Sequence, residues 1–121
     1  MPHAVIVDDN LESSETLAIL LEMEGYVAAT AGSLKEARER LAERRPDVMI
    51  LDRSLPDGQG MDFLTEVLLG GPMTILMLTG TSDAGDAKEA VRRGAAAYLV
   101  KPASIDDLKA AIERAPVISN S

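Results

Sequence analysis

Residues 49–52 read Met-Ile-Leu-Asp, a short apolar run that ends in an acid. Three further runs have the same form: Val5-Ile6-Val7-Asp8-Asp9, Leu76-Met77-Leu78-Thr79 and Tyr98-Leu99-Val100-Lys101-Pro102. Each run has the length and composition of a strand buried in a parallel sheet, and each is too short for a helix. Because ligands bind at the carboxyl ends of the strands in an open parallel sheet, we expect the polar residues that close these runs to share one cleft.

The segments between the runs carry signals for helices. Asn10 is placed to cap a helix that Gly25 ends, and Ser33 opens a capping box at the start of the next helix. Ser104 opens a second capping box ahead of the last helix. A weaker strand is expected over residues 26–31, between the first and second helices.

The middle of the chain continues this alternation of strands and helices. Residues 53–60 are expected to form a loop that leads into the third helix. We expect the fourth helix over about residues 83–93, with Ala87, Ala90 and Val91 facing inward. The whole sequence therefore predicts an α/β fold, a three-layer doubly wound (βα)5 sandwich whose five-stranded parallel sheet has the flavodoxin-like order 2-1-3-4-5.

The composition indicates one acidic globular domain. At 121 residues the chain is too short for two domains, so we assign residues 1–115 to one domain and residues 116–121 to a C-terminal linker stub. The formal net charge of −8 disfavours direct binding to nucleic acid or to an anionic membrane, since both require basic patches. The chain contains no cysteine, no leader pattern and no stretch of membrane-spanning length, and we expect a cytoplasmic protein.

The polar residues at the ends of the runs suit the formation of an acyl phosphate. Each of them taken alone is a weak signal, because acids and lysines at strand ends are common on protein surfaces. Together, carboxylates without histidine or cysteine favour Mg²⁺, and Asp8 and Asp9 are the expected ligands. Asp52 on the central strand is the expected nucleophile. Lys101 and Thr79 are expected to contact the phosphoryl oxygens.

Four segments, in this order and spacing, resemble the bacterial response-regulator receiver domain over residues 4 to about 115: Val7-Asp8-Asp9, Asp52-Arg53-Ser54-Leu55-Pro56-Asp57-Gly58-Gln59-Gly60, Leu78-Thr79-Gly80 and Tyr98-Leu99-Val100-Lys101-Pro102. The resemblance implies that Asp52 accepts a phosphoryl group from a sensor histidine kinase or a phosphotransfer protein. It also implies that Mg²⁺ is bound by Asp8, Asp9, Asp52 and the backbone carbonyl of Ser54.

The resemblance implies a switch as well. Lys101 would pair with the acyl phosphate, and the peptide bond before Pro102 is expected to be cis. Thr79 would move towards the phosphoryl group and Tyr98 would turn inward, which would change the surface of the fourth helix, fifth strand and fifth helix. Tyr98 is equally well explained as an ordinary half-buried aromatic residue of a strand.

We expect this surface to contact an output domain or a downstream protein. A phosphorylation-dependent homodimer is a further expectation. The run Leu78-Thr79-Gly80 and the stub at residues 116–121 are similar to receivers of sigma-54-dependent transcriptional activators. Two positions depart from the common pattern of the family. Arg53 follows the phosphoacceptor where an apolar residue is usual, and Ala103 stands where phenylalanine often follows Lys-Pro.

Three other functions compete with this interpretation. A phosphohydrolase that uses an aspartyl phosphate needs similar groups, but Ser54 stands where such enzymes have a second acid, and no cap domain is present. A dinucleotide-binding protein is disfavoured because no Gly-x-Gly-x-x-Gly follows the first strand. A degenerate receiver that only docks partners conflicts with the complete set of acids, and only Arg53 favours it.

Overall fold

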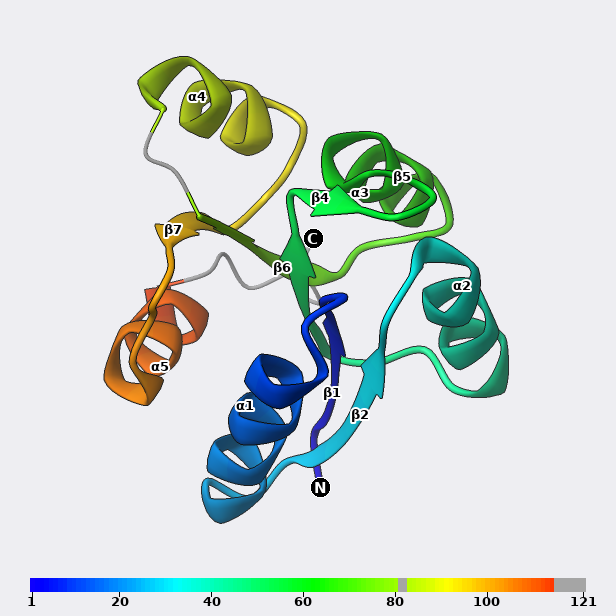
Figure 1. Ribbon diagram of the computed structural model, residues 1–121, viewed down its shortest axis with the longest axis vertical. Helices are drawn as coiled ribbons and strands as arrows, with labels where there is room; N and C mark the ends of the chain where they lie inside the picture. Colours follow the sequence, from blue (N-terminus) through cyan, green and yellow to red (C-terminus); the bar gives the residue numbers. More distant parts are fainter. Residues whose placement is uncertain (81–82, 115–121) are drawn as a thin grey trace.

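The computed structural model describes residues 1–80 and 83–114, and its core is a single parallel sheet (Figure 1). The strands of this sheet are β1 (His3–Val7), β2 (Val27–Ala31), β3 (Val48–Asp52), β6 (Thr74–Thr79) and β7 (Ala97–Val100). Their order is β2-β1-β3-β6-β7, which is 2-1-3-4-5 when the strands of this sheet are counted along the chain. The predicted fold class and strand order are therefore confirmed, whereas the expected linker stub lies outside the described residues.

Helices cover both faces of the sheet and complete a three-layer sandwich (Figure 1). One face packs against α1 (Leu11–Met23) and α5 (Ile105–Arg114). The other face packs against α2 (Leu34–Glu43), α3 (Gly60–Leu69) and α4 (Ala84–Arg92). All neighbouring strands are parallel, so the carboxyl ends of all five lie at one edge of the sheet.

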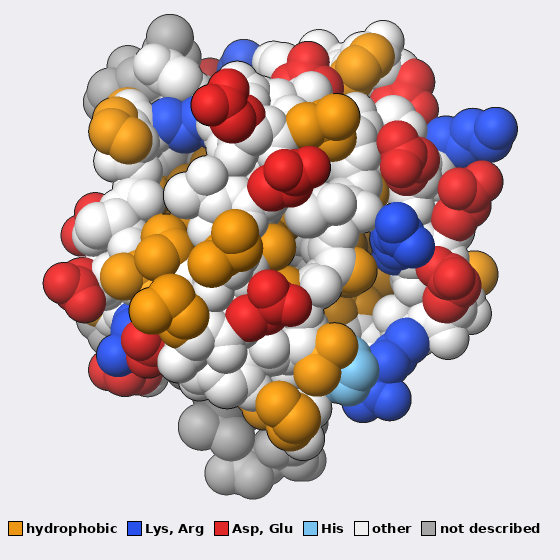
Figure 2. Space-filling view, turned by 60° about the horizontal axis from the view of Figure 1, so that its bottom comes forward, with side chains coloured by type: hydrophobic (Ala, Val, Ile, Leu, Met, Phe, Trp, Pro, Cys, Tyr) orange, Lys and Arg blue, Asp and Glu red, His pale blue; other side chains and the backbone are white. Residues whose placement is uncertain are grey.

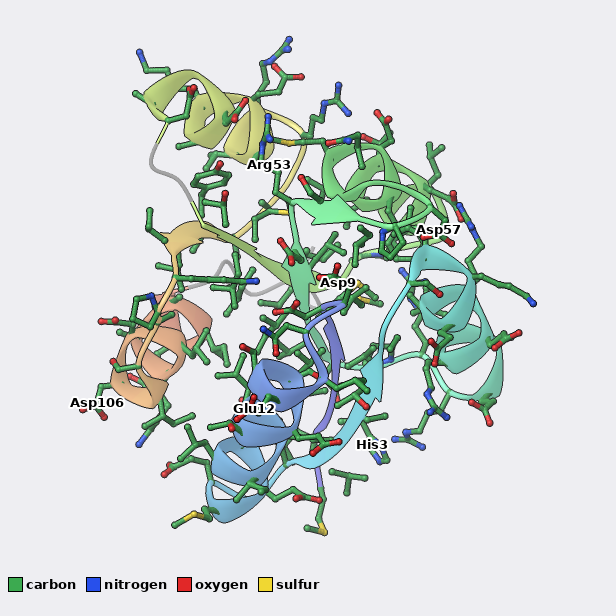
Figure 3. All side chains as sticks on the ribbon, in the orientation of Figure 1. His3, Asp9, Glu12, Arg53, Asp57 and Asp106 are labelled. Carbon is green, nitrogen blue, oxygen red and sulfur yellow. The ribbon has the colours of Figure 1, made fainter. Side chains whose placement is uncertain are left out.

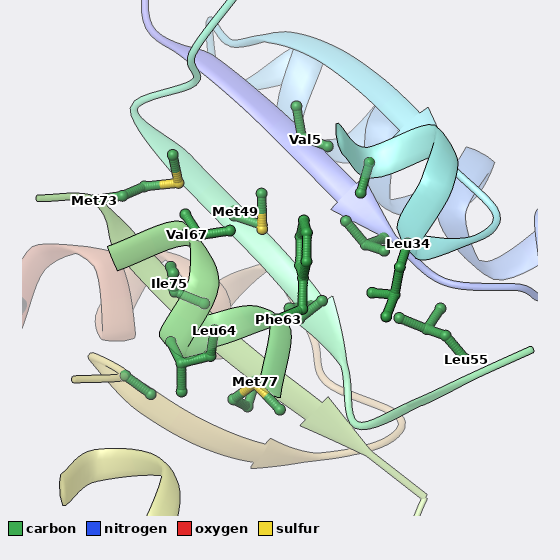
Figure 4. Close-up of a cluster of buried hydrophobic side chains, with 14 of the residues drawn as sticks. Val5, Leu34, Met49, Leu55, Phe63, Leu64, Val67, Met73, Ile75 and Met77 are labelled. Atoms are coloured by element: carbon green, nitrogen blue, oxygen red, sulfur yellow. The ribbon is translucent and has the colours of Figure 1, made fainter. Parts of the chain in front are cut away.

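The pleat of the strands decides which helix layer each side chain meets. In β3, Met49 and Leu51 belong to the core cluster between the sheet and α2 and α3, which Figure 4 shows. Val48 and Ile50 alternate with them and belong to the cluster beside α1 and α5. This alternation continues to the ends of the strands, where it also decides on which side of the sheet each polar side chain lies.

The helix starts follow the expected capping chemistry. The side chain of Asn10 accepts a hydrogen bond of 3.0 Å from the backbone N of Ser13, and Ser33 accepts one of 3.1 Å from Glu36. At the start of α5, Ser104 and Asp107 bond each other's backbone N atoms reciprocally, which is the predicted capping box. These local bonds fix the first turns of α1, α2 and α5 directly after the strand ends.

Two expectations about local structure were wrong. Residues 53–60 are not all loop, because β4 (Ser54–Leu55) and β5 (Gly58–Gln59) form a short antiparallel hairpin held by the burial of Leu55. Val91 does not face inward. Its side chain is 56% exposed, because α4 meets the sheet through its neighbour Ala90, about a quarter-turn away.

The surface carries acids and apolar groups side by side. Figure 2 shows this mixture in a view turned from that of Figure 1 so that the bottom of the molecule comes forward. Most basic side chains lie towards the edges of this face. Among the described residues on this face, no continuous basic patch of the kind that a nucleic-acid backbone requires is seen. Within residues 1–80 and 83–114, no helix has both the length and the apolar character needed to cross a membrane.

Candidate functional site

A lysine joins two carboxylates at the carboxyl edge of the sheet. Asp8 follows β1, Asp52 ends β3 and Lys101 follows β7. Nζ of Lys101 lies 2.9 Å from Oδ2 of Asp8 and 3.0 Å from Oδ2 of Asp52. All three residues have the parity of the side chains that face α1 and α5, so the pleat brings them to the same side of the sheet.

Asp9 completes an acidic cluster with these two carboxylates. One carboxylate oxygen from each of Asp8, Asp9 and Asp52 lies within 4.8 Å of the other two. Asp8 is 2% exposed and Asp52 9% exposed, whereas Asp9 is open to solvent above the end of β1 (Figure 3). A cluster of hard oxygen donors that is open on one side suits Mg²⁺, which keeps part of its water shell.

Burial and charge act against each other on the side chains of this site. Burial raises the pKa of the Asp52 carboxyl, and the Asp8 carboxylate adds to this effect, while the hydrogen bond and the charge of Lys101 offset it in part. Burial alone lowers the pKa of Lys101, but its bonds to Asp8 and Asp52 outweigh burial and raise that pKa. The ammonium is therefore held charged between the two acids, and the buried Asp52 carboxylate remains incompletely compensated.

Thr79 and Tyr98 lie at the same edge but on the other side of the sheet. Thr79 ends β6 and is 3% exposed, and its carbonyl accepts a hydrogen bond of 2.7 Å from the backbone N of Lys101. Tyr98 packs on the core cluster beneath α3 and α4. The Tyr98 hydroxyl is buried and has no hydrogen-bond partner among the described residues. The Lys101–Pro102 peptide bond is cis.

The loop after Asp52 is held close to α3 by a glycine. The backbone N of Gly60 donates to the carbonyl of Arg53 at 2.7 Å, and a Cβ on Gly60 would lie only 2.1 Å from the carbonyl oxygen of Asp52. The backbone N of Ser54 approaches Oδ1 of Asp52 at 3.4 Å. Sequence reasoning placed Gly60 in a motif but gave no reason for it, and the reason is this close approach of two backbone segments.

Sequence reasoning also missed an ion pair that connects the residue after Asp52 to α4. Nη2 of Arg53 lies 2.8 Å from Oδ2 of Asp86, which belongs to the first turn of α4. Figure 3 shows Arg53 extending from the end of β3 towards α4. The only sequence signal for it was the unusual cation at position 53.

A hollow of about 370 Å³ adjoins the site on the side of α1. Its lining includes Asp8, Ser13 and Leu20 of the first strand–helix unit, and Lys101 and Ala103 after β7. A partner group that entered this hollow would lie beside Asp8 and Lys101.

Comparisons with known proteins agree with this site. The family model of the response regulator receiver domain matches residues 4–113. The alginate biosynthesis transcriptional regulatory protein AlgB of Pseudomonas putida is 37% identical to this chain over 108 residues, a match that covers 88% of this chain and 24% of AlgB. The chain spans between about a quarter and about half the length of the curated relatives it matches.

Solved structures give the same result. A response regulator protein from Burkholderia pseudomallei, solved with a phosphorylated aspartic acid, a calcium ion and citrate, is similar with a TM-score of 0.86 and 30% identity, covering 92% of this chain and 66% of that one. The beryllofluoride-activated NtrC4 receiver domain dimer is similar with a TM-score of 0.86 and 31% identity, covering 94% of this chain and 96% of that one. The strand order, the acidic site at the strand ends and these matches together show that the chain belongs to the family of response regulator receiver domains, the signalling domains of two-component systems.

Proposed function

We propose that Asp52 accepts a phosphoryl group from a sensor histidine kinase or a phosphotransfer protein. The observation that carries this proposal is the position of Lys101, whose ammonium is bonded to both Asp8 and Asp52 at the edge of the sheet. A cation fixed at this point can neutralise charge on a phosphoryl group bound to Asp52. The chain would act as a signalling module that promotes only its own phosphorylation and dephosphorylation.

The transfer itself needs one bond to form and one to break. An Oδ atom of Asp52 forms a bond to phosphorus while the bond between phosphorus and the donor's imidazole nitrogen breaks. The electron pair of that bond stays on the imidazole, which then takes up a proton.

The acidic cluster fits Mg²⁺, because all three side chains offer hard carboxylate oxygens. Asp8, Asp9 and Asp52 would hold the ion together with the backbone carbonyl of Ser54. When bound, Mg²⁺ supplies positive charge that reduces repulsion between the Asp52 carboxylate and the phosphoryl oxygens. Lys101 would contact the phosphoryl group, and Thr79 would donate its hydroxyl to the same group.

The donor is expected to dock over α1. The hollow between α1 and residues 101–103 opens beside Asp8 and Lys101, so a segment that carries a phosphohistidine could reach the site from there. The cytoplasm is the proposed place of action of this chain.

Phosphorylation would be read through the surface of α4, β7 and α5, with Thr79 and Tyr98 as the switch residues. The relatives named as transcriptional regulatory proteins support an output domain that controls transcription, and the dimeric NtrC4 receiver supports a phosphorylation-dependent homodimer. We further propose that residues 1–115 form the receiver domain and residues 116–121 a linker, as in a sigma-54-dependent activator.

Intact-mass measurement after incubation with acetyl phosphate tests the proposed chemistry. We expect one phosphoryl adduct on the wild-type protein in the presence of Mg²⁺ and none in EDTA. Asp52→Asn should form no adduct under either condition. An adduct of equal yield on Asp52→Asn, or in EDTA, would contradict the proposal.

A further inference from the structure

The backbone of Arg53, directly after β3, is hydrogen-bonded to two other segments of the chain. Its backbone N donates to the carbonyl of Leu78 at 3.0 Å, and its own carbonyl accepts from Gly60 at 2.7 Å. Because successive side chains of a strand point to opposite faces, Arg53 extends to the side of α4, whereas Asp52 faces α1 and α5. Asp52 is therefore the direct neighbour in the chain of a cation that extends towards α4.

The ion pair that Arg53 makes is partly buried. The side chains of Arg53 and Asp86 are 34% and 28% exposed, and Nη2 and Oδ2 lie 2.8 Å apart. Nε of Arg53 is buried and has no hydrogen-bond partner among the described residues. The guanidinium meets Asp86 through Nη2, and its buried Nε donor has no partner among the described residues, so a new negative charge nearby can compete with Asp86 for this cation.

The attachment of α4 to the rest of the molecule depends strongly on charged groups. Within α4, all of whose residues are described, Ala90 alone is buried. At its end, Nη1 of Arg93 donates to the carbonyl of Met61 on α3 at 3.2 Å. At its start, Asp86 pairs with Arg53. Because α4 has little apolar contact, these two polar contacts are an important part of its attachment to the rest of the molecule.

We propose that the Arg53–Asp86 ion pair is a latch that holds the start of α4 while Asp52 is unphosphorylated, and that phosphorylation of Asp52 weakens it. This inference rests on the proposed function and names the link between the phosphoacceptor and α4. A phosphoryl group adds about one negative charge to the residue next to Arg53. The added charge competes with Asp86 for the guanidinium and repels the Asp86 carboxylate, so the first turn of α4 is released.

Hydrogen–deuterium exchange of the amides in residues 84–92 tests the latch. In the unphosphorylated protein, we expect Arg53→Gln and Asp86→Asn each to raise the exchange rate at least fivefold. The double variant should show about the same rate as either single variant, because both remove one interaction. Arg92→Gln is the control, since Arg92 is exposed and pairs with Glu89 of the same helix.

The same samples are then treated with acetyl phosphate and Mg²⁺, and their phosphorylation is read by intact mass. The wild-type rate should rise about fivefold, whereas Arg53→Gln, although phosphorylated, should show no further rise. If the unphosphorylated variants exchange at the wild-type rate, or if the effects of the two substitutions add in the double variant, the latch is contradicted but the proposed function is not. An equal rise on phosphorylation in wild type and Arg53→Gln would overturn the release step. A wild-type protein that forms no adduct would overturn the release step together with the proposed function.

Discussion

Nζ of Lys101 lies 3.0 Å from Oδ2 of Asp52, although the two residues are 49 positions apart in the chain. The contact exists because β3 and β7 are both parallel strands of one sheet and end at the same edge. The same ammonium bonds Asp8 at 2.9 Å, so one cation serves two buried carboxylates. The metal-free stability of the site therefore depends on Lys101.

Lys101→Met should lower the metal-free stability by about 1–3 kcal/mol, because two buried carboxylates lose their shared partner. This corresponds to a fall in Tm of several degrees for a domain of this size. Thermal unfolding in EDTA measures it. The control is Lys109→Met, which breaks a more exposed pair with Glu24 and should change Tm by less than about 2 °C. An equal effect of the two substitutions would show that Lys101 has no special role.

Asp52→Asn should raise the Tm of the metal-free protein by about 2–4 °C. Burial and the nearby Asp8 carboxylate raise the pKa of Asp52 despite the opposing effect of Lys101, so its charge destabilises the folded state at neutral pH. Millimolar Mg²⁺ should raise the Tm of wild type, through binding to the native state, and that of Asp52→Asn by less. A lower Tm for Asp52→Asn in EDTA would argue against an under-compensated acidic cluster.

The fold and the members of the acidic site were predictable because they depend on short-range signals. The strand runs, caps and breakers are local, and parallel connectivity then brings Asp8, Asp52 and Lys101 to one edge without further information. The pairing of Arg53 with Asp86 was not predictable. It depends on how α4 is placed over the sheet, which side-chain periodicity does not determine. The exposure of Val91 was missed for the same reason, since the placement of α4 over the sheet decides that Ala90 is covered and its neighbour Val91 is not.

Gly60→Ala should lower the free energy of unfolding by about 2–3 kcal/mol. A Cβ on Gly60 would lie 2.1 Å from the carbonyl oxygen of Asp52, and the atom in its way is backbone rather than a flexible side chain. Gly80→Ala is the control, because a Cβ there meets no described atom within 4 Å. Urea unfolding of both variants measures the difference, and equal stabilities would show that the loop can move away from α3 at little cost.

Asp57 links the loop after β3 to α2 and should make stability depend on pH. Its carboxylate accepts hydrogen bonds from the backbone N atoms of Leu34 at 2.8 Å and Lys35 at 3.0 Å, and these bonds lower its pKa, the first of them most. A depressed pKa contributes stability above the unfolded-state value, and this contribution is lost as the pH falls through the folded-state value. The loss is therefore expected below about pH 4.

Asp57→Asn should be less stable than wild type at pH 7, and the difference in Tm should shrink as the pH falls from about 5 to about 2. Thermal unfolding across this range measures it. Asp106→Asn, which removes an exposed acid from the first turn of α5, is the matched control. A difference between wild type and Asp57→Asn that stays constant across this range would contradict the assigned role of the carboxylate.

The identity of the phosphorylated residue tests the central claim most directly. Protein treated with acetyl phosphate and Mg²⁺ is reduced with borohydride, which converts an aspartyl phosphate to homoserine, and is then sequenced by tandem mass spectrometry. We predict homoserine at position 52, with Asp8 and Asp9 unchanged. Homoserine at position 8 or 9, or unmodified Asp52 in protein whose mass shows the adduct, would contradict the assignment of Asp52 as the phosphoacceptor.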